Sequence, residues 1–200
     1  MNNLEVLKQE LVHYSRRCYE RNMISATGGN ISIRVPGENA MLIKASGCAF
    51  SDMTVDDVIL ADFEGNIIEG DKQISKEWRF HSGIYKERED INSVVHIHPP
   101  YATAVANTMD HLPLVTNHAK VYLKDVPTIG IASSGSEELG ENAVAPFKGS
   151  DRIAVLMEEH GIISANINIR KAFFLAEMLE DTAKIYLFSL LNKKGAKDER

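Results

Sequence analysis

Short apolar or alternating segments, bounded by turn residues, alternate along this chain with longer segments of helical periodicity. Strands are predicted at residues 31–35, 41–44, 58–60, 66–68, 93–98, 128–131, 153–157 and 162–165. The first four form two hairpins, since the Pro-Gly-containing turn at 36–39 and the Glu-Gly turn at 64–65 join them. The apolar faces of such strands need helices to cover them. The chain is therefore predicted to be α/β, a three-layer αβα sandwich around a mixed, mostly antiparallel sheet.

The intervening segments supply the helices of this sandwich. Apolar residues recur every three or four positions over residues 2–22 and again over about 169–191. Ser75 is the expected N-cap of a helix through about Arg88, and another helix begins near Ser136. At 200 residues and 44% hydrophobic composition, the chain is long enough for one full core. We expect a single domain spanning residues 1–200.

Charge and hydropathy exclude several functional classes. The formal net charge is −6 and no dense basic stripe is present, which argues against a nucleic-acid partner. No apolar stretch approaches the roughly 20 residues that a membrane span needs, and the N-terminus lacks the features of a signal peptide. Cys18 and Cys48 are the only cysteines and are expected to be reduced thiols. The expected compartment is the cytoplasm.

Three histidines form the strongest chemical signal. His96 and His98 close the apolar run 93–98, and residues i and i+2 of a strand point to the same face. Pro-Pro follows at once and ends the strand, which places the pair near a sheet edge where sites form. His160 follows a second buried-strand pattern at 153–157. A lone His-x-His is often structural, but three imidazoles with an open fourth position describe a catalytic zinc site.

Further candidates have two readings each. Glu77, near the start of a helix, is either an acid stabilised by the helix dipole or a carboxylate that completes a metal shell or moves a proton. The loops 27–30 and 45–47 are either ordinary glycine turns or phosphate cradles built from backbone N–H groups and hydroxyls.

Other histidines and aromatic residues near these motifs are read as structural or surface residues. His81 lies on the same helix face as Glu77 and is read as a residue packed behind the site. We read Trp78 and Phe80 as core residues, and His111 and His118 as surface residues.

Taken together, five motifs in this order resemble the class II aldolase/adducin family over almost the whole chain. They are Thr27-Gly28-Gly29-Asn30-Ile31-Ser32, Lys44-Ala45-Ser46-Gly47, Ser75-Lys76-Glu77-Trp78-Arg79-Phe80-His81, His96-Ile97-His98 and Glu159-His160-Gly161. The resemblance implies one zinc ion per subunit held by His96, His98 and His160, with Glu77 as the general base. It also implies a homotetramer with active sites at subunit interfaces. The implied contacts to a substrate phosphate come from Thr27, Gly28, Asn30, Ser46, Gly47, Ser75 and Lys76.

The activity implied by this resemblance is zinc-dependent, reversible cleavage of a short ketose 1-phosphate, similar to L-fuculose 1-phosphate. The products would be dihydroxyacetone phosphate and an aldehyde, formed through a metal-stabilised enediolate. Lys76 replaces a serine of the aldolase pattern, and a lysine here resembles relatives that decarboxylate 3-oxo-tetronate 4-phosphates. The alternative is therefore such a decarboxylase, or a related sugar-phosphate dehydratase.

Other departures from the family pattern concern proton donors and the metal. Asn117 stands where the aldolases use a tyrosine, Tyr122 lies nearby, and the tail that carries a second tyrosine in the aldolase is not expected after Arg200. Divalent metals other than zinc (Mn, Co, Ni or Fe) also suit a histidine-rich site. A non-catalytic assembly module, as in the adducin branch, is the alternative from another functional class. The metal histidines and Glu77 argue against it.

Overall fold

A mixed β-sheet of eight strands forms the middle layer of the structure, a computed structural model that describes residues 3–198. The strands are β1 (Asn30–Arg34), β2 (Ala40–Lys44), β3 (Val58–Asp62), β4 (Ile67–Glu69), β5 (Ser93–Ile97), β6 (Thr128–Ile129), β7 (Ala154–Met157) and β8 (Gly161–Asn166). Their order across the sheet is β4-β3-β2-β1-β5-β8-β7-β6. Neighbouring strands are antiparallel except β6 and β7, which are parallel. The predicted mixed, mostly antiparallel sheet is confirmed.

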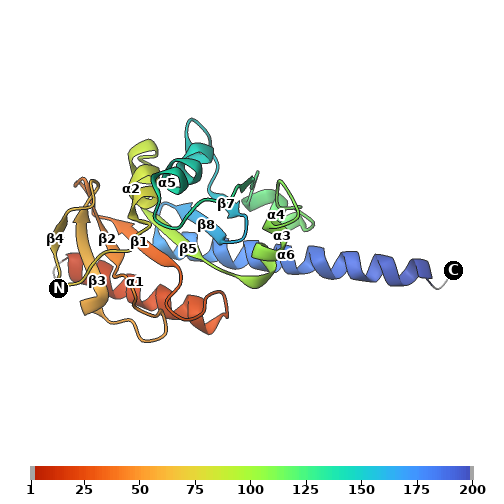
Figure 1. The fold of residues 1–200 in the computed structure, drawn as a ribbon, viewed down its shortest axis with the longest axis horizontal. Coiled ribbons are helices and arrows are strands. Elements are labelled where there is room, and N and C mark those ends of the chain that lie inside the picture. Colours follow the sequence, from red (N-terminus) through yellow and green to blue (C-terminus); the bar gives the residue numbers. More distant parts are fainter. Residues whose placement is uncertain (1–2, 199–200) are drawn as a thin grey trace.

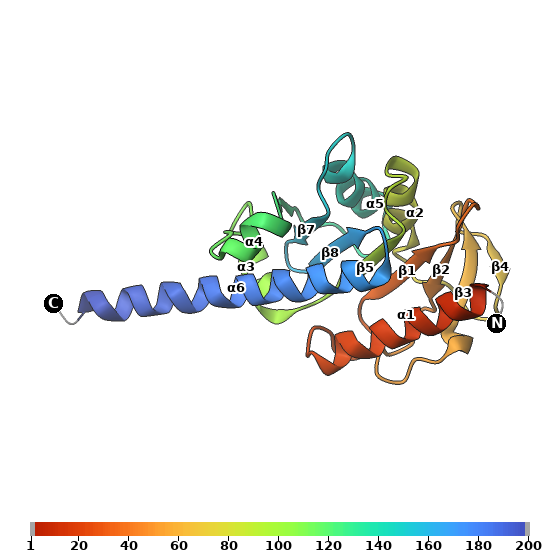
Figure 2. The same ribbon diagram turned by 180° about the vertical axis from the view of Figure 1, so that it is seen from behind.

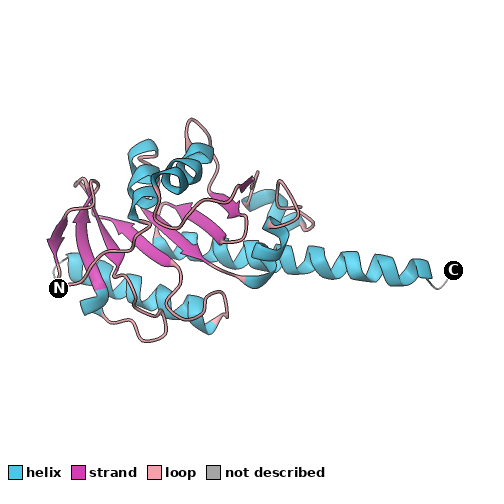
Figure 3. Ribbon diagram, viewed as in Figure 1, coloured by secondary structure: helices cyan, strands magenta, loops and turns pink. Residues whose placement is uncertain are grey.

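Helices cover both faces of the sheet (Figures 1 and 3). The helices are α1 (Asn3–Glu20), α2 (Trp78–Glu87), α3 (Pro100–Ala106), α4 (Asn117–Tyr122), α5 (Glu137–Val144) and α6 (Ile169–Asp198), with 3-10 turns at Val55–Asp57 and Ala145–Phe147. Figure 2 shows α1 and α6 in front of the sheet, with α2 and α5 above it. Alternate strand residues supply two cores, so that Leu42 packs with the α1 and α6 side and Ile43 with the α2 and α5 side. This is the predicted three-layer sandwich.

The N-terminus of α2 differs from the sequence prediction. The helix begins at Trp78, and the N-cap position is held by Glu77 rather than by Ser75. Ile74 forms a β-bridge with Ala45, and the Ser75 N–H donates to the Lys44 carbonyl. The Ser75 hydroxyl still accepts from the Glu77 N–H at 3.3 Å, but the turn that follows becomes regular helix only at Trp78. The displaced start brings the side chain of Glu77 to the sheet edge.

Two further elements depart from expectation. α4 was not predicted, because the segment containing Pro113 was read as loop; the Thr116 hydroxyl caps the helix by accepting from the Ala119 N–H at 3.1 Å. α6 runs to Asp198, beyond the predicted end near Leu191, and extends past the sheet (Figure 1). No helix among residues 3–198 combines the length and the apolar character that a membrane crossing requires.

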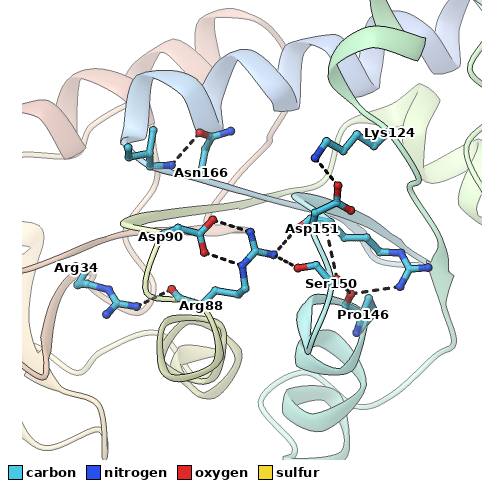
Figure 4. A network of polar contacts seen from close by, with 10 residues as sticks. Arg34, Arg88, Asp90, Lys124, Pro146, Ser150, Asp151 and Asn166 are labelled. Carbon is cyan, nitrogen blue, oxygen red and sulfur yellow. Dashed lines mark hydrogen bonds and ion pairs between the residues drawn. The ribbon is translucent and has the colours of Figure 1, made fainter.

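A polar network closes the end of the sheet opposite the histidines (Figure 4). Arg88, after α2, forms a two-pronged ion pair with Asp90 at 2.7 Å and donates to the Ser150 carbonyl at 2.6 Å. Arg34, at the end of β1, donates to the Arg88 carbonyl at 3.0 Å. These contacts tie the α2 layer to β1 and to the loop before β7. They lie at the opposite end of the strands from the three histidines.

Candidate metal centre

Three segments distant in the sequence bring their histidines together at one edge of the sheet. His96 lies in β5, His98 follows that strand, and His160 lies in the turn between β7 and β8. One ligand nitrogen from each lies within 4.8 Å of the others. The Nε2 atoms of His96 and His98 are 3.1 Å apart. The three side chains can therefore hold a metal ion.

The geometry and protonation of these imidazoles fit a divalent metal. Two nitrogens bound to tetrahedral zinc at about 2.05 Å lie about 3.3 Å apart, close to the separation found here. His96 Nδ1 is 2.9 Å from the Ile162 carbonyl, which can only accept, so Nδ1 carries the hydrogen and Nε2 presents a lone pair. Burial lowers the pKa of His98 to about 3, with smaller contributions from His96 and His160. A neutral imidazole is the form that binds metal.

Glu77 completes the polar group around the histidines. Its Oε2 lies 3.3 Å from His96 Nε2 and its Oε1 lies 3.2 Å from His160 Nε2. Its side chain makes no capping bond to α2, so the helix does not use it as an N-terminal acid. Burial alone would raise the pKa of this carboxyl, but the neighbouring His160 and His96 side chains and the Ser134 hydroxyl hold it well below its usual range. Glu77 is therefore an ionised carboxylate beside the three nitrogens.

Two glycines let the histidine segments approach one another. A Cβ on Gly161 would lie 2.2 Å from the Ile97 carbonyl oxygen, so only glycine lets β8 begin beside the end of β5. A Cβ on Gly28 would lie 2.9 Å from Nδ1 and 3.0 Å from Cε1 of His98. The loop before β1 therefore packs its backbone directly on one imidazole.

A cavity of about 160 Å³ opens beside these side chains. Every residue predicted from the sequence to contact phosphate lines it, together with Glu77, His98 and His160: Thr27, Gly28, Asn30, Ser46, Gly47, Ser75 and Lys76. Gly29, which belongs to the predicted loop 27–30, also lines it, as do Lys44 and Ser134, for which no role was predicted. His96 is fully buried beside His98. The structure brings these residues together around one cavity, and their roles remain predictions.

Lys44 is the functional candidate that sequence reasoning missed. Its side chain is 1% exposed, and Nζ donates to the carbonyls of Ala45 and Cys48 at 3.2 and 2.6 Å. Burial lowers the pKa of Lys44, an effect that the negative charges of Asp57 and Glu77 oppose. Two of its three donors are used, so one remains for a ligand in the cavity. A lysine at the end of a strand that is otherwise apolar, Ala40–Ile43, was the available signal.

Ser134 was missed because it lies in a loop without periodicity. Its hydroxyl donates to Glu77 Oε1 at 2.7 Å, while the Asn30 amide donates to Oε2 at 2.7 Å. Both carboxylate oxygens are thus held. The side chain of Asn30 is used by this bond and by His81, so its predicted phosphate contact would come from another atom of the residue.

The remaining predicted residues lie where expected. Phe80 and His81 are buried, Trp78 packs half-buried at the edge of the core, and His111 and His118 are exposed. Among the described residues that line the cavity there is no tyrosine. Tyr122 instead lines a larger groove of about 810 Å³ between α4 and α6, which contains none of the predicted site residues.

The αβα sandwich carries three histidines and a carboxylate together at one sheet edge, an arrangement that suits a divalent metal with proton transfer beside it. Comparison with known proteins identifies the family. Residues 9–187 match the family model described as Class II Aldolase and Adducin N-terminal domain, so the chain belongs to this family. The match confirms the predicted family and the expectation of an aldolase-type lyase.

Individual relatives cover nearly the whole chain. A 5-deoxy-D-ribulose 1-phosphate aldolase of Bacillus thuringiensis is 34% identical over 184 residues, which is 92% of this chain and 85% of that protein. An L-fuculose phosphate aldolase of Methanococcus maripaludis is 32% identical over 176 residues, 88% of this chain and 93% of the relative. A solved L-fuculose 1-phosphate aldolase superposes with a TM-score of 0.85 at 36% identity, covering 92% of this chain and 85% of the other.

Proposed function

We propose that this protein is a zinc-dependent aldolase that reversibly cleaves a short ketose 1-phosphate to dihydroxyacetone phosphate and an aldehyde. The observation that carries the proposal is the position of the Glu77 carboxyl group, set between His96 and His160 at the side of a polar cavity. Relatives whose names specify fuculose phosphate and 5-deoxyribulose 1-phosphate support a 1-phosphorylated ketose.

The residues divide the chemistry between a metal site and a base. A zinc ion held by His96, His98 and His160 would supply Lewis-acid stabilisation of the negative charge on the substrate enediolate formed when C3–C4 breaks. Cleavage moves one proton from the C4 hydroxyl to C3: the ionised Glu77 carboxylate would take up a proton as the C4 carbonyl forms and then deliver a proton to C3, and in the synthetic direction it removes the proton from C3. Asn30 and Ser134 hold the carboxylate in place for that transfer.

Phosphate recognition falls to the polar side of the cavity. Ser46 and Gly47 follow β2, Thr27 and Gly28 precede β1, and backbone N–H groups and hydroxyls of such loops suit phosphate oxygens. Lys44 supplies the buried positive charge. Holding the phosphate at a distance from the reacting carbons orients them relative to Glu77.

The test is a coupled assay for dihydroxyacetone phosphate. Fuculose, rhamnulose, ribulose, 5-deoxyribulose and xylulose 1-phosphates are offered to the protein with chelator and with added Zn, Mn, Co, Ni or Fe. Release that chelator abolishes and one metal restores supports the proposal, and the preferred sugar identifies the substrate. No release by any metal-loaded sample refutes it.

Lys76 favours one alternative, a decarboxylase of a 3-oxo-tetronate 4-phosphate or a related dehydratase. Its side chain lines the cavity and the residue is exposed, so its ammonium group can meet a substrate carboxylate. If so, Lys76→Ser lowers decarboxylation and raises aldol cleavage. Equal losses in both activities argue against a carboxylate contact.

A homotetramer is the proposed assembly. α6 projects past the sheet and exposes apolar side chains, among them Ile185 at 45%, Phe188 at 49% and Leu191 at 62%. Apolar surface of this kind favours burial between subunits. Light scattering on the purified protein tests the assembly, and a monomeric mass at micromolar concentration contradicts it.

A further inference from the structure

A line of buried polar side chains runs from the proposed base into the core between α2 and β1. Glu77 Oε2 accepts from Asn30 Nδ2 at 2.7 Å, and Asn30 Oδ1 contacts His81 Nε2 at short range. His81 Nδ1 lies 2.6 Å from Ser32 Oγ, which lies 2.7 Å from Tyr85 Oη. All five residues are at most 6% exposed. The reacting carboxylate is thus the outer end of a closed network.

The two periodicities of the sequence explain why this line forms. Glu77, His81 and Tyr85 recur every four residues and lie on one side of α2, while Asn30 and Ser32 recur every two residues on one face of β1. Four helical residues advance about 6 Å and two strand residues about 6.6 Å. The polar side chains of the helix and those of the strand therefore have nearly the same spacing, so they remain opposite one another where α2 and β1 lie side by side.

Donor and acceptor rules assign every hydrogen in the line. A carboxylate only accepts, so Asn30 turns its NH₂ to Glu77 and its carbonyl to His81. That carbonyl also only accepts, so His81 carries its hydrogen on Nε2. Burial lowers the pKa of His81 to about 3, so the ring is neutral and its Nδ1 accepts from Ser32.

The far end of the line follows from the same rules. Since Ser32 gives its hydrogen to His81, its oxygen receives one from Tyr85. Burial also raises the pKa of the Tyr85 phenol, which keeps it protonated and able to donate. Every hydrogen bond therefore points from Tyr85 toward Glu77, and bonds aligned in this way strengthen one another.

We propose that His81 is a positioning residue for the reaction: by donating from Nε2 to Asn30 it fixes which way the Asn30 amide faces, and so holds the Glu77 carboxylate where it meets substrate. The inference rests on the proposed role of Glu77 as the base. Without the His81 donor, the amide is free to rotate and to present its oxygen to the carboxylate, which repels it. The proton-transfer step then suffers, while the metal ligands and the phosphate loops are untouched.

Two amide substitutions separate this role from simple packing. In His81→Gln the side-chain NH₂ reaches the Nε2 position and keeps the bond to Asn30. In His81→Asn the amide reaches only the Nδ1 position, so it keeps the Ser32 bond and loses the Asn30 bond. Both variants are uncharged and smaller than or similar in size to histidine, which makes them matched controls for each other.

The expected result is a split between kcat and KM. His81→Asn lowers kcat by about 10- to 100-fold, the range for partners that orient active groups, with unchanged KM and metal content. His81→Gln stays within about threefold of the parent, because the orienting bond survives. Equal kcat values in the two variants, or losses that follow their melting temperatures, overturn the proposal. If neither variant folds, Asn30→Leu carries the test and must lower kcat by the same factor; an unchanged kcat overturns it.

A failure of the proposed function gives a different result. If the unsubstituted, metal-loaded protein turns over none of the sugar phosphates, the base role of Glu77 is lost, and kinetics no longer report on His81. Crystal structures of the two variants then decide the positioning role. It requires that the Asn30–Glu77 bond of 2.7 Å persists with Gln at position 81 and is broken with Asn. An intact bond in both variants overturns it.

Discussion

Adding a single methyl group at Gly28 is expected to weaken metal binding without unfolding the protein. The backbone of Gly28 needs no left-handed conformation, so alanine is allowed there, yet its Cβ would lie 2.9 Å from His98 Nδ1 and 3.0 Å from Cε1. Ordinary carbon contacts begin at about 3.4–3.5 Å. The imidazole or the loop must therefore move by about half an ångström.

This displacement is large for a metal ligand. Zinc–nitrogen bonds hold to within about 0.2 Å of their usual length. A shift of half an ångström exceeds that tolerance, and His98 cannot retreat freely because His96 Nε2 lies 3.1 Å away. We expect Gly28→Ala to weaken zinc binding by about 10- to 100-fold, which corresponds to about 1.4–2.8 kcal/mol.

Competition with a chromophoric chelator measures the zinc dissociation constant, and thermal unfolding of the metal-free protein checks the fold. Gly130→Ala is the matched control, since nothing lies within 4 Å of a Cβ there and its backbone is also unstrained. A Gly28→Ala protein that binds zinc as tightly as the parent would refute the reasoning, because the methyl group would then be accommodated without moving the ligand.

Three other changes test different parts of the site. Glu77→Gln should keep its zinc and lose about 10²- to 10⁴-fold in kcat, since general-base catalysis is worth that much; full turnover would exclude the base role. Lys44→Met should raise KM for the sugar phosphate about 10- to 100-fold by removing a charge-assisted contact, whereas the exposed Lys120→Met should not; equal KM values contradict the phosphate role. The pKa of His81 is about 3 when folded, below its unfolded value, so the unfolded state binds the extra proton and stability falls as pH drops from about 6.5 toward 3. In metal-free protein, chemical denaturation should show this loss as about 1.4 kcal/mol per pH unit relative to His81→Gln; parallel curves would disprove it.

Local patterns predicted the parts of this protein whose information lies within one segment. His96 and His98 share a strand face because the side-chain period of a strand is two, and the strand ends where Pro99 and Pro100 follow. α5 begins beside Ser136 as predicted, and the Ser136 hydroxyl caps it by accepting from the Leu139 N–H at 3.0 Å. The five family motifs, taken together, predicted the family to which the whole chain belongs.

Some predictions failed where a distant strand competes with a local signal. Ser75 has the chemistry of an N-cap and its hydroxyl accepts from the Glu77 N–H at 3.3 Å, but its own N–H is bonded to the Lys44 carbonyl at the end of β2, and regular helix starts only at Trp78. α4 was missed because the segment containing Pro113 was read as loop, although the Thr116 hydroxyl caps the helix that follows.

The sequence by itself determined the alternation of strands and helices, the paired histidines at the end of β5 and the four-residue spacing of Glu77, His81 and Tyr85. Only the tertiary structure decided which of these faces meet. The order β1-β5-β8 places Asn30 opposite His96 in register and brings the turn carrying His160 to the same edge. The physical reason is that periodicity is a property of neighbouring residues, whereas the order of strands depends on burying apolar surface over the whole chain at once. The carboxylate, the third histidine and the buried lysine come together only through that global packing.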